Sequence, residues 1–247
     1  MSGKTFPYEV AELTAPCLGL IALQSDETVE RDMRRLLPSD IEFMVTRVPS
    51  SEDVTSDTLA AMEGHLTAAA SLFPQGSRFD AVAYGCTSGA AQIGPAQVAA
   101  KIRDAIDVAT VTQPLSSLVA ACSHMGIKRL ALLSPYVTSV SARLRDALQT
   151  AGIETPVFGS FEVGREATVV RITAASVEAA ALELMQDADV DALFLSCTNL
   201  RTLDVIQTLE QKLGLPVLSS NQVLAWHMMT QAGIAAPDAA PGLLFQN

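Results

Sequence analysis

The sequence has little charge, few aromatic residues and no hydrophobic run long enough to cross a membrane. Charged residues make up 17% and aromatic residues 5% of the 247 positions. The longest apolar runs, such as residues 18–23, are the size of a strand, whereas a membrane-spanning helix needs about 18 apolar residues or more. Residues 1–16 have no apolar stretch of the kind that a secretory signal needs. We therefore expect a cytoplasmic protein that does not contact a membrane.

Signals for metals, cofactors and nucleic acids are also missing. The chain has four cysteines and three histidines, but no Cys-x-x-Cys pair and no histidine with a second ligand at metal spacing. No Gly-x-Gly-x-x-Gly motif follows the first predicted strand, which excludes the usual dinucleotide site. The net charge of −11 repels phosphate backbones, so nucleic acid is not an expected partner. We predict neither a metal nor an organic cofactor.

What the sequence does have is a regular alternation of short apolar runs and amphipathic segments. Hydrophobic residues make up 49% of the chain, which is typical of a compact globular protein. Helical spacing predicts helices over residues 59–72, 96–106, 176–185 and 202–213. Strands that alternate with helices form parallel sheets covered by helices on both faces, so we predict an α/β fold.

The chain also repeats itself. Asp80–Thr87 and Asp191–Thr198 both read Asp-Ala, four strand-type residues and Cys-Thr, and we expect both to lead into a helix. Two further strand pairs align in the same order and at a similar offset: 18–23 with 130–134, and 108–112 with 215–219. After the first strand pair we expect helices over residues 27–37 and 139–151. After the second strand pair we expect two helices that each end in Gly-Ile. These matches predict two halves with a common ancestor.

The duplication predicts two pseudo-symmetric lobes, each a parallel sheet flanked by helices. We expect an N-terminal lobe over residues 1–115, completed by about 225–247, and a C-terminal lobe over 116–224. Ligands of open α/β sheets bind beyond the carboxyl ends of the strands, where both Cys-Thr motifs lie. If the lobes face each other about a pseudo-twofold axis, Cys86 and Cys197 meet across one inter-lobe cleft. We predict that this cleft is the active site.

A Cys-Thr pair at a helix N-terminus combines a reactive sulfur with groups that hold an anion. The positive end of the backbone dipole favours the thiolate, and unpaired N–H groups of the first turn bind a carboxylate. Cys86 and Cys197 are therefore the candidate catalytic residues, whereas Cys17 and Cys122 are interpreted as inert buried cysteines.

Polar residues at the same strand ends are candidates for holding the substrate. Asp26 and Glu27 are interpreted instead as the start of a helix. Thr112, Gln113, Ser219, Ser220 and Asn221 are weaker candidates, because loop caps use the same residue types. The candidate substrate-binding residues are Gln24, Ser25, Thr87, Ser88, Tyr136, Thr198 and Asn199.

From about Leu18 to Gly233 the chain resembles the aspartate/glutamate racemase superfamily. The core motifs read Gly85-Cys86-Thr87-Ser88 and Ser196-Cys197-Thr198-Asn199. Residues 132–136, which include Tyr136, look like the tyrosine-bearing strand of maleate isomerase and arylmalonate decarboxylase. Residues 18–28 look similar to the opening of ectoine-utilisation proteins of the EutA type. The resemblance implies an Asp/Glu racemase-like fold and cofactor-independent cysteine chemistry on a small carboxylate.

The chain also departs from each of these branches. Glutamate racemases carry a histidine where this chain has Asn199. Maleate isomerases usually have Ser-Asn-Thr where this chain reads Gln24-Ser25-Asp26. Arylmalonate decarboxylase keeps only the second cysteine, so the presence of Cys86 favours chemistry on two sides of the substrate.

Three functions stay open at this point. The first is a racemase or isomerase, in which one thiolate removes a proton α to a carboxylate and the other thiol reprotonates the opposite face. In a maleate-isomerase-like version, the Cys86 thiolate adds to a double bond and Cys197 shuttles the proton. A role in ectoine or hydroxyectoine degradation is expected from the opening strand. The second function is an arylmalonate-type decarboxylase, and the third is a non-catalytic small-carboxylate-binding or sensor protein.

We also expect a homo-oligomer.

Overall fold

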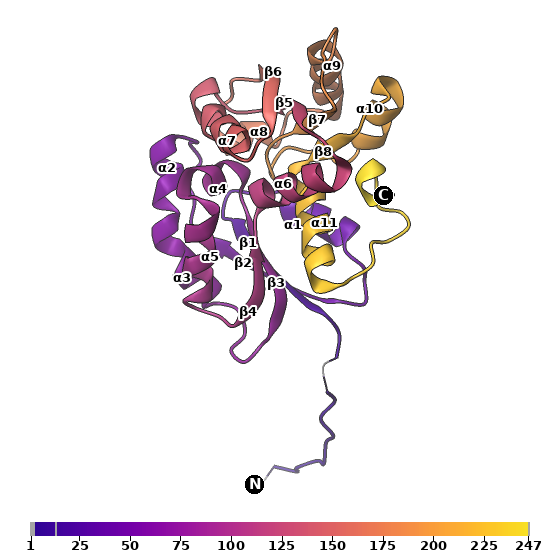
Figure 1. The fold of residues 1–247 in the computed structure, drawn as a ribbon. Helices are drawn as coiled ribbons and strands as arrows, with labels where there is room; N and C mark the ends of the chain where they lie inside the picture. Colours follow the sequence, from indigo (N-terminus) through magenta and orange to yellow (C-terminus); the bar gives the residue numbers. More distant parts are fainter. Residues whose placement is uncertain (1–2, 13, 247) are drawn as a thin grey trace.

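Each half of the chain forms one four-stranded parallel sheet in the computed structural model, which describes residues 3–12 and 14–246. The strand order is β2-β1-β3-β4 in the first sheet and β6-β5-β7-β8 in the second. This identical order confirms the predicted α/β fold with two pseudo-symmetric lobes (Figure 1). The strands of the first sheet are β1 (Cys17–Leu23), β2 (Glu42–Val48), β3 (Phe79–Gly85) and β4 (Val108–Thr112). Those of the second are β5 (Arg129–Ser134), β6 (Glu154–Ser160), β7 (Ala192–Leu195) and β8 (Val217–Ser219).

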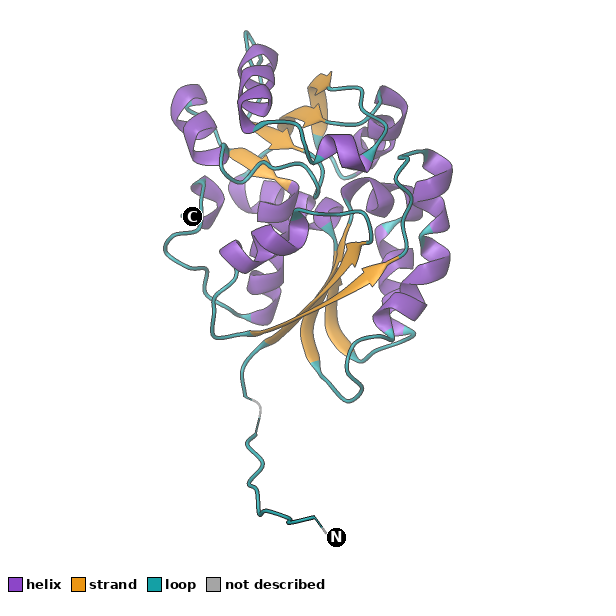
Figure 2. Ribbon diagram, turned by 180° about the vertical axis from the view of Figure 1, so that it is seen from behind, coloured by secondary structure: helices purple, strands orange, loops and turns teal. Residues whose placement is uncertain are grey.

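Helices flank both sheets (Figure 2), and two of them connect the lobes. The helix α6 (Pro114–Met125) leads from β4 to the second sheet. The helix α11 (Ser220–Ala232) starts at the end of β8 and packs back against β3 and β4 of the first sheet. The other helices are α1 (Val29–Leu36), α2 (Ser56–Ala61), α3 (Glu63–Ala70), α4 (Thr87–Ile93), α5 (Pro95–Arg103), α7 (Thr138–Thr150), α8 (Glu166–Val169), α9 (Ala174–Leu184), α10 (Ile206–Leu213) and the 3-10 turn η1 (Leu243–Phe245).

Matched side chains and caps support the internal repeat. The Asp80 carboxylate accepts the N–H of Cys17 at 2.9 Å, and the Asp191 carboxylate accepts the N–H of Arg129 at 2.8 Å. Each aspartate therefore fixes the start of the strand next to its own. The connecting helices α6 and α11 both end at a left-handed glycine, Gly126 and Gly233, as the Gly-Ile pattern predicts.

Some predicted elements differ from the observed ones. The helix predicted over residues 59–72 is two helices that meet at Met62, and the helix predicted over 202–213 begins only at Ile206. The strands β2 and β6 were not predicted. Both lie at the edges of their sheets and are partly exposed, so their apolar pattern is weaker than that of the central strands.

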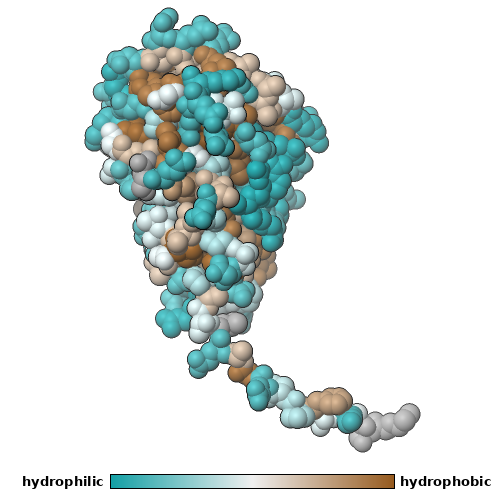
Figure 3. Space-filling model, turned by 90° about the vertical axis from the view of Figure 1, so that its right-hand side faces the viewer, coloured by the Kyte–Doolittle hydropathy of each residue, from teal (hydrophilic) through white to brown (hydrophobic). Residues whose placement is uncertain are grey.

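Residues 3–12 extend away from the body of the protein (Figure 3). Three apolar side chains of this segment are exposed: Phe6, Tyr8 and Val10. Within the described residues, no helix has the length and apolar character needed to span a bilayer. The expected homo-oligomer stays a prediction.

Gly19, in the central strand β1, provides a test of how tightly the first sheet is covered. A Cβ atom at this position would lie 2.9 Å from Cγ2 of Val82 and 3.1 Å from Cζ of Phe73. We expect Gly19→Ala to lower the free energy of unfolding by about 1–3 kcal/mol through overpacking. Gly64→Ala is the matched control, because Gly64 lies in the exposed part of α3 with nothing within 4 Å. Urea unfolding should show the control unchanged or slightly more stable, and equal effects of both changes would contradict this packing.

Candidate active site

Cys86 lies directly after β3 and caps the N-terminus of α4, as the first Cys-Thr motif predicts. Its side chain is 4% exposed, and its Sγ accepts a hydrogen bond from the Gly89 N–H at 3.1 Å. A Cβ atom on residue 89 would come within 2.9 Å of this sulfur and 2.6 Å of the Tyr84 hydroxyl. Gly89 therefore allows the backbone to approach the thiol closely.

The prediction that Cys197 also precedes a helix is wrong. Residues 198–200 form a bend, and the next helix, α10, begins at Ile206. Cys197 itself has a φ of 96°, a region that favours glycine, and is 2% exposed. Its N–H donates to the Ser220 hydroxyl at 3.0 Å, and its sulfur accepts the N–H of Asn199 at 3.3 Å. The bend thus supplies one backbone donor to the second thiol, the N–H of Asn199.

A buried carboxylate joins Tyr136 and Asn199 beside the second thiol. The Tyr136 hydroxyl lies 2.9 Å from Sγ of Cys197 and donates to Oε1 of Glu166 at 2.6 Å. The Asn199 amide donates to the other carboxylate oxygen of Glu166 at 2.7 Å. Because the single hydroxyl hydrogen of Tyr136 goes to Glu166, the Cys197 thiol donates its hydrogen to Tyr136. The order of donation is therefore from thiol to phenol to carboxylate.

Three of the buried groups around the thiols were not among the predicted site residues. Glu166 begins α8, in a segment without a motif or a strand signal. Asp26 starts a helix as interpreted, since its Oδ1 accepts the N–H groups of Thr28 and Val29 at 2.7 Å each, but its charge also acts on both thiols. Tyr84 places its phenol beside Cys86 and is fully buried. The signal that could have identified Tyr84 is its position two residues before Cys86.

The remaining predicted residues divide into two groups. Thr87 and Thr198 are buried and bind across the lobes, Thr87 to the Ser220 hydroxyl at 2.8 Å and Thr198 to the Gly85 carbonyl oxygen at 3.1 Å. Ser88 is buried beside them. The Gln24 side chain is exposed, and the Ser25 hydroxyl pairs with that of Ser50 at 3.0 Å. Among the hydrogen bonds of the described residues, neither Gln24 nor Ser25 reaches a thiol.

The thiols are uncharged in this environment. Burial raises the pKa of Cys86 to about 12, and the charges of Glu166 and Asp26 add to the increase despite the Gly89 hydrogen bond. Burial also raises the pKa of Cys197 well above its usual range, again with contributions from Glu166 and Asp26. The pKa values of both carboxyl groups are in turn raised by burial, and Asp26 also raises that of Glu166. The site is therefore a buried cluster of acidic groups in which a charge on either carboxyl group disfavours ionisation of its neighbours.

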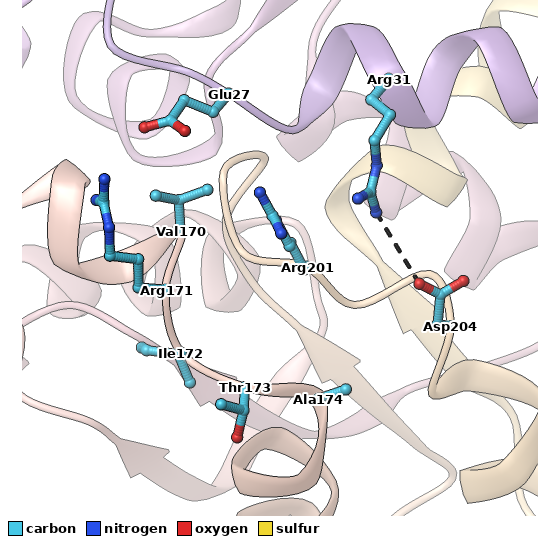
Figure 4. A pocket seen from close by; sticks show the side chains of 9 residues that line it. All are labelled: Glu27, Arg31, Val170, Arg171, Ile172, Thr173, Ala174, Arg201 and Asp204. Atoms are coloured by element: carbon cyan, nitrogen blue, oxygen red, sulfur yellow. Dashed lines mark ion pairs between the residues drawn. The ribbon is translucent and has the colours of Figure 1, made fainter.

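An open pocket of about 570 Å³ lies near this cluster but is not lined by either cysteine (Figure 4). Its walls carry Arg31, Arg171 and Arg201, together with Glu27 and Asp204, and Arg31 pairs with Asp204 at 3.9 Å. A small cavity that Glu166 lines lies on the side of β1 and α2. Within the described ranges, no group of three His, Cys, Asp or Glu side chains is placed to hold a metal ion.

Two parallel four-stranded sheets with a thiol at matching strand ends define the Asp/Glu racemase-like class of α/β proteins. The chain belongs to the arylmalonate decarboxylase family, whose family model matches residues 18–245. It is 26% identical over 237 residues to maleate isomerase of Nocardia farcinica, covering 91% of this chain and 92% of that protein. It is also 26% identical over 235 residues to arylmalonate decarboxylase of Bordetella bronchiseptica, covering 94% and 96%.

Solved structures give the same result. The maleate isomerase of Pseudomonas putida S16 superposes with a TM-score of 0.84 at 22% identity, over 94% of this chain and 98% of that chain. A cysteine-to-serine variant of the Nocardia farcinica enzyme, with a covalently bound succinylcysteine intermediate, superposes with a TM-score of 0.80 at 26% identity, over 94% and 99%. The predicted superfamily resemblance is confirmed.

The backbone at Cys197 predicts an unusual order of stability. With glycine in its place, the strain of a positive φ is relieved, which is worth about 1–3 kcal/mol and exceeds the roughly 0.5–1 kcal/mol that glycine costs in the unfolded chain. We expect Cys197→Gly to be as stable as Cys197→Ala or more stable. At Cys86, where φ is −148°, the glycine variant should be the less stable of the two. Thermal unfolding of the four variants measures this, and the same order at both positions would contradict the assigned backbone.

The raised thiol pKa values predict a pH dependence. A raised pKa keeps the folded thiol protonated where the unfolded one, with a pKa of about 8.5, has ionised, so stability falls as pH rises from about 8.5 towards 12. We expect no thiolate absorbance from the folded protein up to about pH 9, and thiolate formation near pH 8.5 in urea. Ultraviolet titration of the wild type, Cys86→Ala and Cys197→Ala measures both. A folded-state thiolate near neutral pH without ligand would contradict the closed acidic site.

Proposed function

We propose that the chain is a cofactor-independent racemase or isomerase that acts on a small carboxylate through Cys86 and Cys197. One observation carries this proposal: two buried thiols lie at matching strand ends of two lobes, and the same pair of carboxylates, Asp26 and Glu166, acts on both. The two motifs also meet at one residue, because the Ser220 hydroxyl accepts the Thr87 hydroxyl at 2.8 Å and the Cys197 N–H at 3.0 Å. The covalent succinylcysteine in the Nocardia farcinica relative supports a chemical role for cysteine in this family.

Two versions of the chemistry fit the thiol pair. In the first, one thiolate takes the proton α to a carboxylate and becomes a thiol. The other thiol then gives its proton to the opposite face of the carbanion and becomes a thiolate. In the second, a Cys86 thiolate adds to the double bond of a cis-unsaturated diacid, and elimination after bond rotation returns the thiolate while Cys197 shuttles the proton.

The hydrogen-bonded chain beside Cys197 supplies a path by which this thiol can ionise. The thiol proton passes to the Tyr136 oxygen while the Tyr136 hydroxyl proton passes to Glu166, so the thiolate forms as the carboxylate becomes neutral. The raised pKa of Glu166, caused by burial, makes it a better proton acceptor. In this proposal Tyr136 and Asn199, which the sequence predicts as substrate-binding residues, position Glu166. Thr87, Ser88 and Thr198 border the substrate, which is the role that the sequence predicts for them.

An arylmalonate-type decarboxylase is the second candidate, favoured by the family model and by the Bordetella bronchiseptica relative. The presence of a cysteine in both motifs favours two-sided proton transfer over it. A role in ectoine or hydroxyectoine degradation stays a prediction from the first strand.

Proton NMR in D₂O with a panel of small carboxylates tests the proposed function. The panel holds both enantiomers of aspartate and glutamate, maleate, phenylmalonate, a hydantoin and hydroxyectoine. We expect one of them to lose an α-proton signal or to isomerise, and Cys86→Ala and Cys197→Ala each to slow this by about a hundredfold or more. Cys122→Ala is the control, because this cysteine is equally buried but lies within α6.

Other outcomes of this assay separate the alternatives. Loss of CO₂ from phenylmalonate that needs only Cys197 would identify a decarboxylase. Ligand-induced stabilisation without any turnover, unaffected by either cysteine change, would contradict the proposal and favour a binding or sensor protein.

A further inference from the structure

Asp26 has a carboxylate oxygen that lacks a partner inside the site. The residue follows β1 at the carboxyl edge of the first sheet and is 3% exposed. Its Oδ1 accepts the N–H groups of Thr28 and Val29, but within the described residues Oδ2 has no hydrogen-bond partner. The Thr198 hydroxyl is near enough to this carboxyl group to lower its pKa, but its hydrogen is donated to the Gly85 carbonyl oxygen at 3.1 Å. A buried carboxylate oxygen without a donor is costly, so its retention here indicates that another group satisfies it.

The unpartnered oxygen belongs to the same site as the thiols. The charge of Asp26 raises the pKa of Cys86, of Cys197 and of Glu166, which places it within electrostatic reach of all three. Glu166 differs from Asp26 because Tyr136 and Asn199 donate to its two oxygens. Of the two buried carboxylates beside the thiols, Asp26 is therefore the one with an oxygen free to bind a ligand.

Arg47 lowers the pKa of Asp26 through its charge, but among the hydrogen bonds of the described residues it donates none to that carboxylate. The Arg47 guanidinium donates to the backbone carbonyl oxygens of Leu23 and Asp26 and to the carboxylate of Glu30. Arg31, Arg171 and Arg201 line the separate pocket shown in Figure 4. The space around the thiols thus carries an excess of negative charge, which a positive group from outside the chain can offset.

We propose that Asp26 binds a cationic nitrogen of the substrate, so that this enzyme takes a zwitterion bearing an ammonium or amidinium group and a carboxylate, not a dicarboxylate. The proposal rests on the proposed function and names its substrate class. An N–H of the cation donates to Oδ2 of Asp26 while the substrate carbon lies between Cys86 and Cys197.

Binding of such a cation also prepares the thiols for reaction. A positive charge beside Asp26 lowers the pKa of both cysteines, whereas a dianion such as maleate adds negative charge and raises their pKa values further. Binding of a zwitterion therefore favours thiolate formation, whereas binding of a dicarboxylate disfavours it. This coupling separates the chain from a maleate isomerase despite the shared fold and cysteines.

Two measurements on the full chain test the substrate class. Alanine and aspartate serve as ammonium probes, hydroxyectoine as an amidinium carboxylate, and maleate as the dianion. In calorimetry, we expect at least one zwitterion to bind and maleate to bind about tenfold more weakly or worse. In ultraviolet difference spectra of the wild type, the binding zwitterion should shift thiolate formation to a lower pH than in the free protein, and maleate should not.

Asp26→Asn tests the residue itself. Removal of the charge should raise the KM for the zwitterion by about tenfold or more, with a smaller change in kcat. It should also reduce the difference in affinity between the zwitterion and maleate. Asp204→Asn is the control, because this carboxylate is mostly exposed and lines the arginine pocket. Preferential binding or turnover of maleate by the wild type would overturn the proposal, and so would an unchanged KM in a folded Asp26→Asn protein. Either result would leave the proposed cysteine chemistry standing, because that chemistry fails only if turnover does not depend on the cysteines.

Discussion

Hydrogen bonds between the lobes hold the two thiol-bearing strand ends in one buried place. The Ser220 hydroxyl accepts the Thr87 hydroxyl of the first motif at 2.8 Å and the Cys197 N–H of the second at 3.0 Å. The Thr198 hydroxyl returns a bond to the Gly85 carbonyl oxygen at 3.1 Å. Because these donors and acceptors are buried, breaking one leaves a polar group unpaired at a cost of about 1–3 kcal/mol. The threonine of each Cys-Thr motif thus fixes the position of both sulfurs, whatever further contact it makes with substrate.

Charge is the second constraint on this site. Two thiols, two phenols and two carboxyl groups are buried at this site, and their donors include backbone N–H groups, the Asn199 amide and the Tyr136 hydroxyl. Burial keeps the thiols protonated, so the resting protein is unreactive towards solvent and oxidants. Chemistry begins when a substrate changes the electrostatic balance. The fold shared with maleate isomerases therefore does not by itself fix the substrate, because the groups around the sulfurs also contribute.

Sequence and structure agree where the pattern is local or repeated. Cys86 and Cys197 could be predicted because a strand, a cysteine and a threonine recur in the same order, and the central strands follow from their apolar runs. Glu166 could not, since its partners Tyr136 and Asn199 lie 30 and 33 positions away along the chain. The helix expected after the second motif is absent because the repeat ends there: Gly89 and small residues follow the first motif, whereas residues 198–200 form a bend after the second cysteine. The edge strands β2 and β6 escaped prediction because their half-exposed residues carry a weak pattern, whereas the edge strands β4 and β8 were predicted with the help of the repeat.

The central claim is that both thiols act on one substrate. For the two-base version, in which they act on opposite faces of one carbon, deuterium labelling is the most direct test. The substrate identified in the panel is converted in D₂O as a single enantiomer to low conversion, and mass spectrometry reads the label in product and recovered substrate. Because each thiol carries one proton, the account predicts a product that contains deuterium at the α-carbon and a recovered substrate that contains none. A product that retains its original hydrogen, or substrate and product labelled equally from the start, would show that a single base serves both faces and would contradict the account.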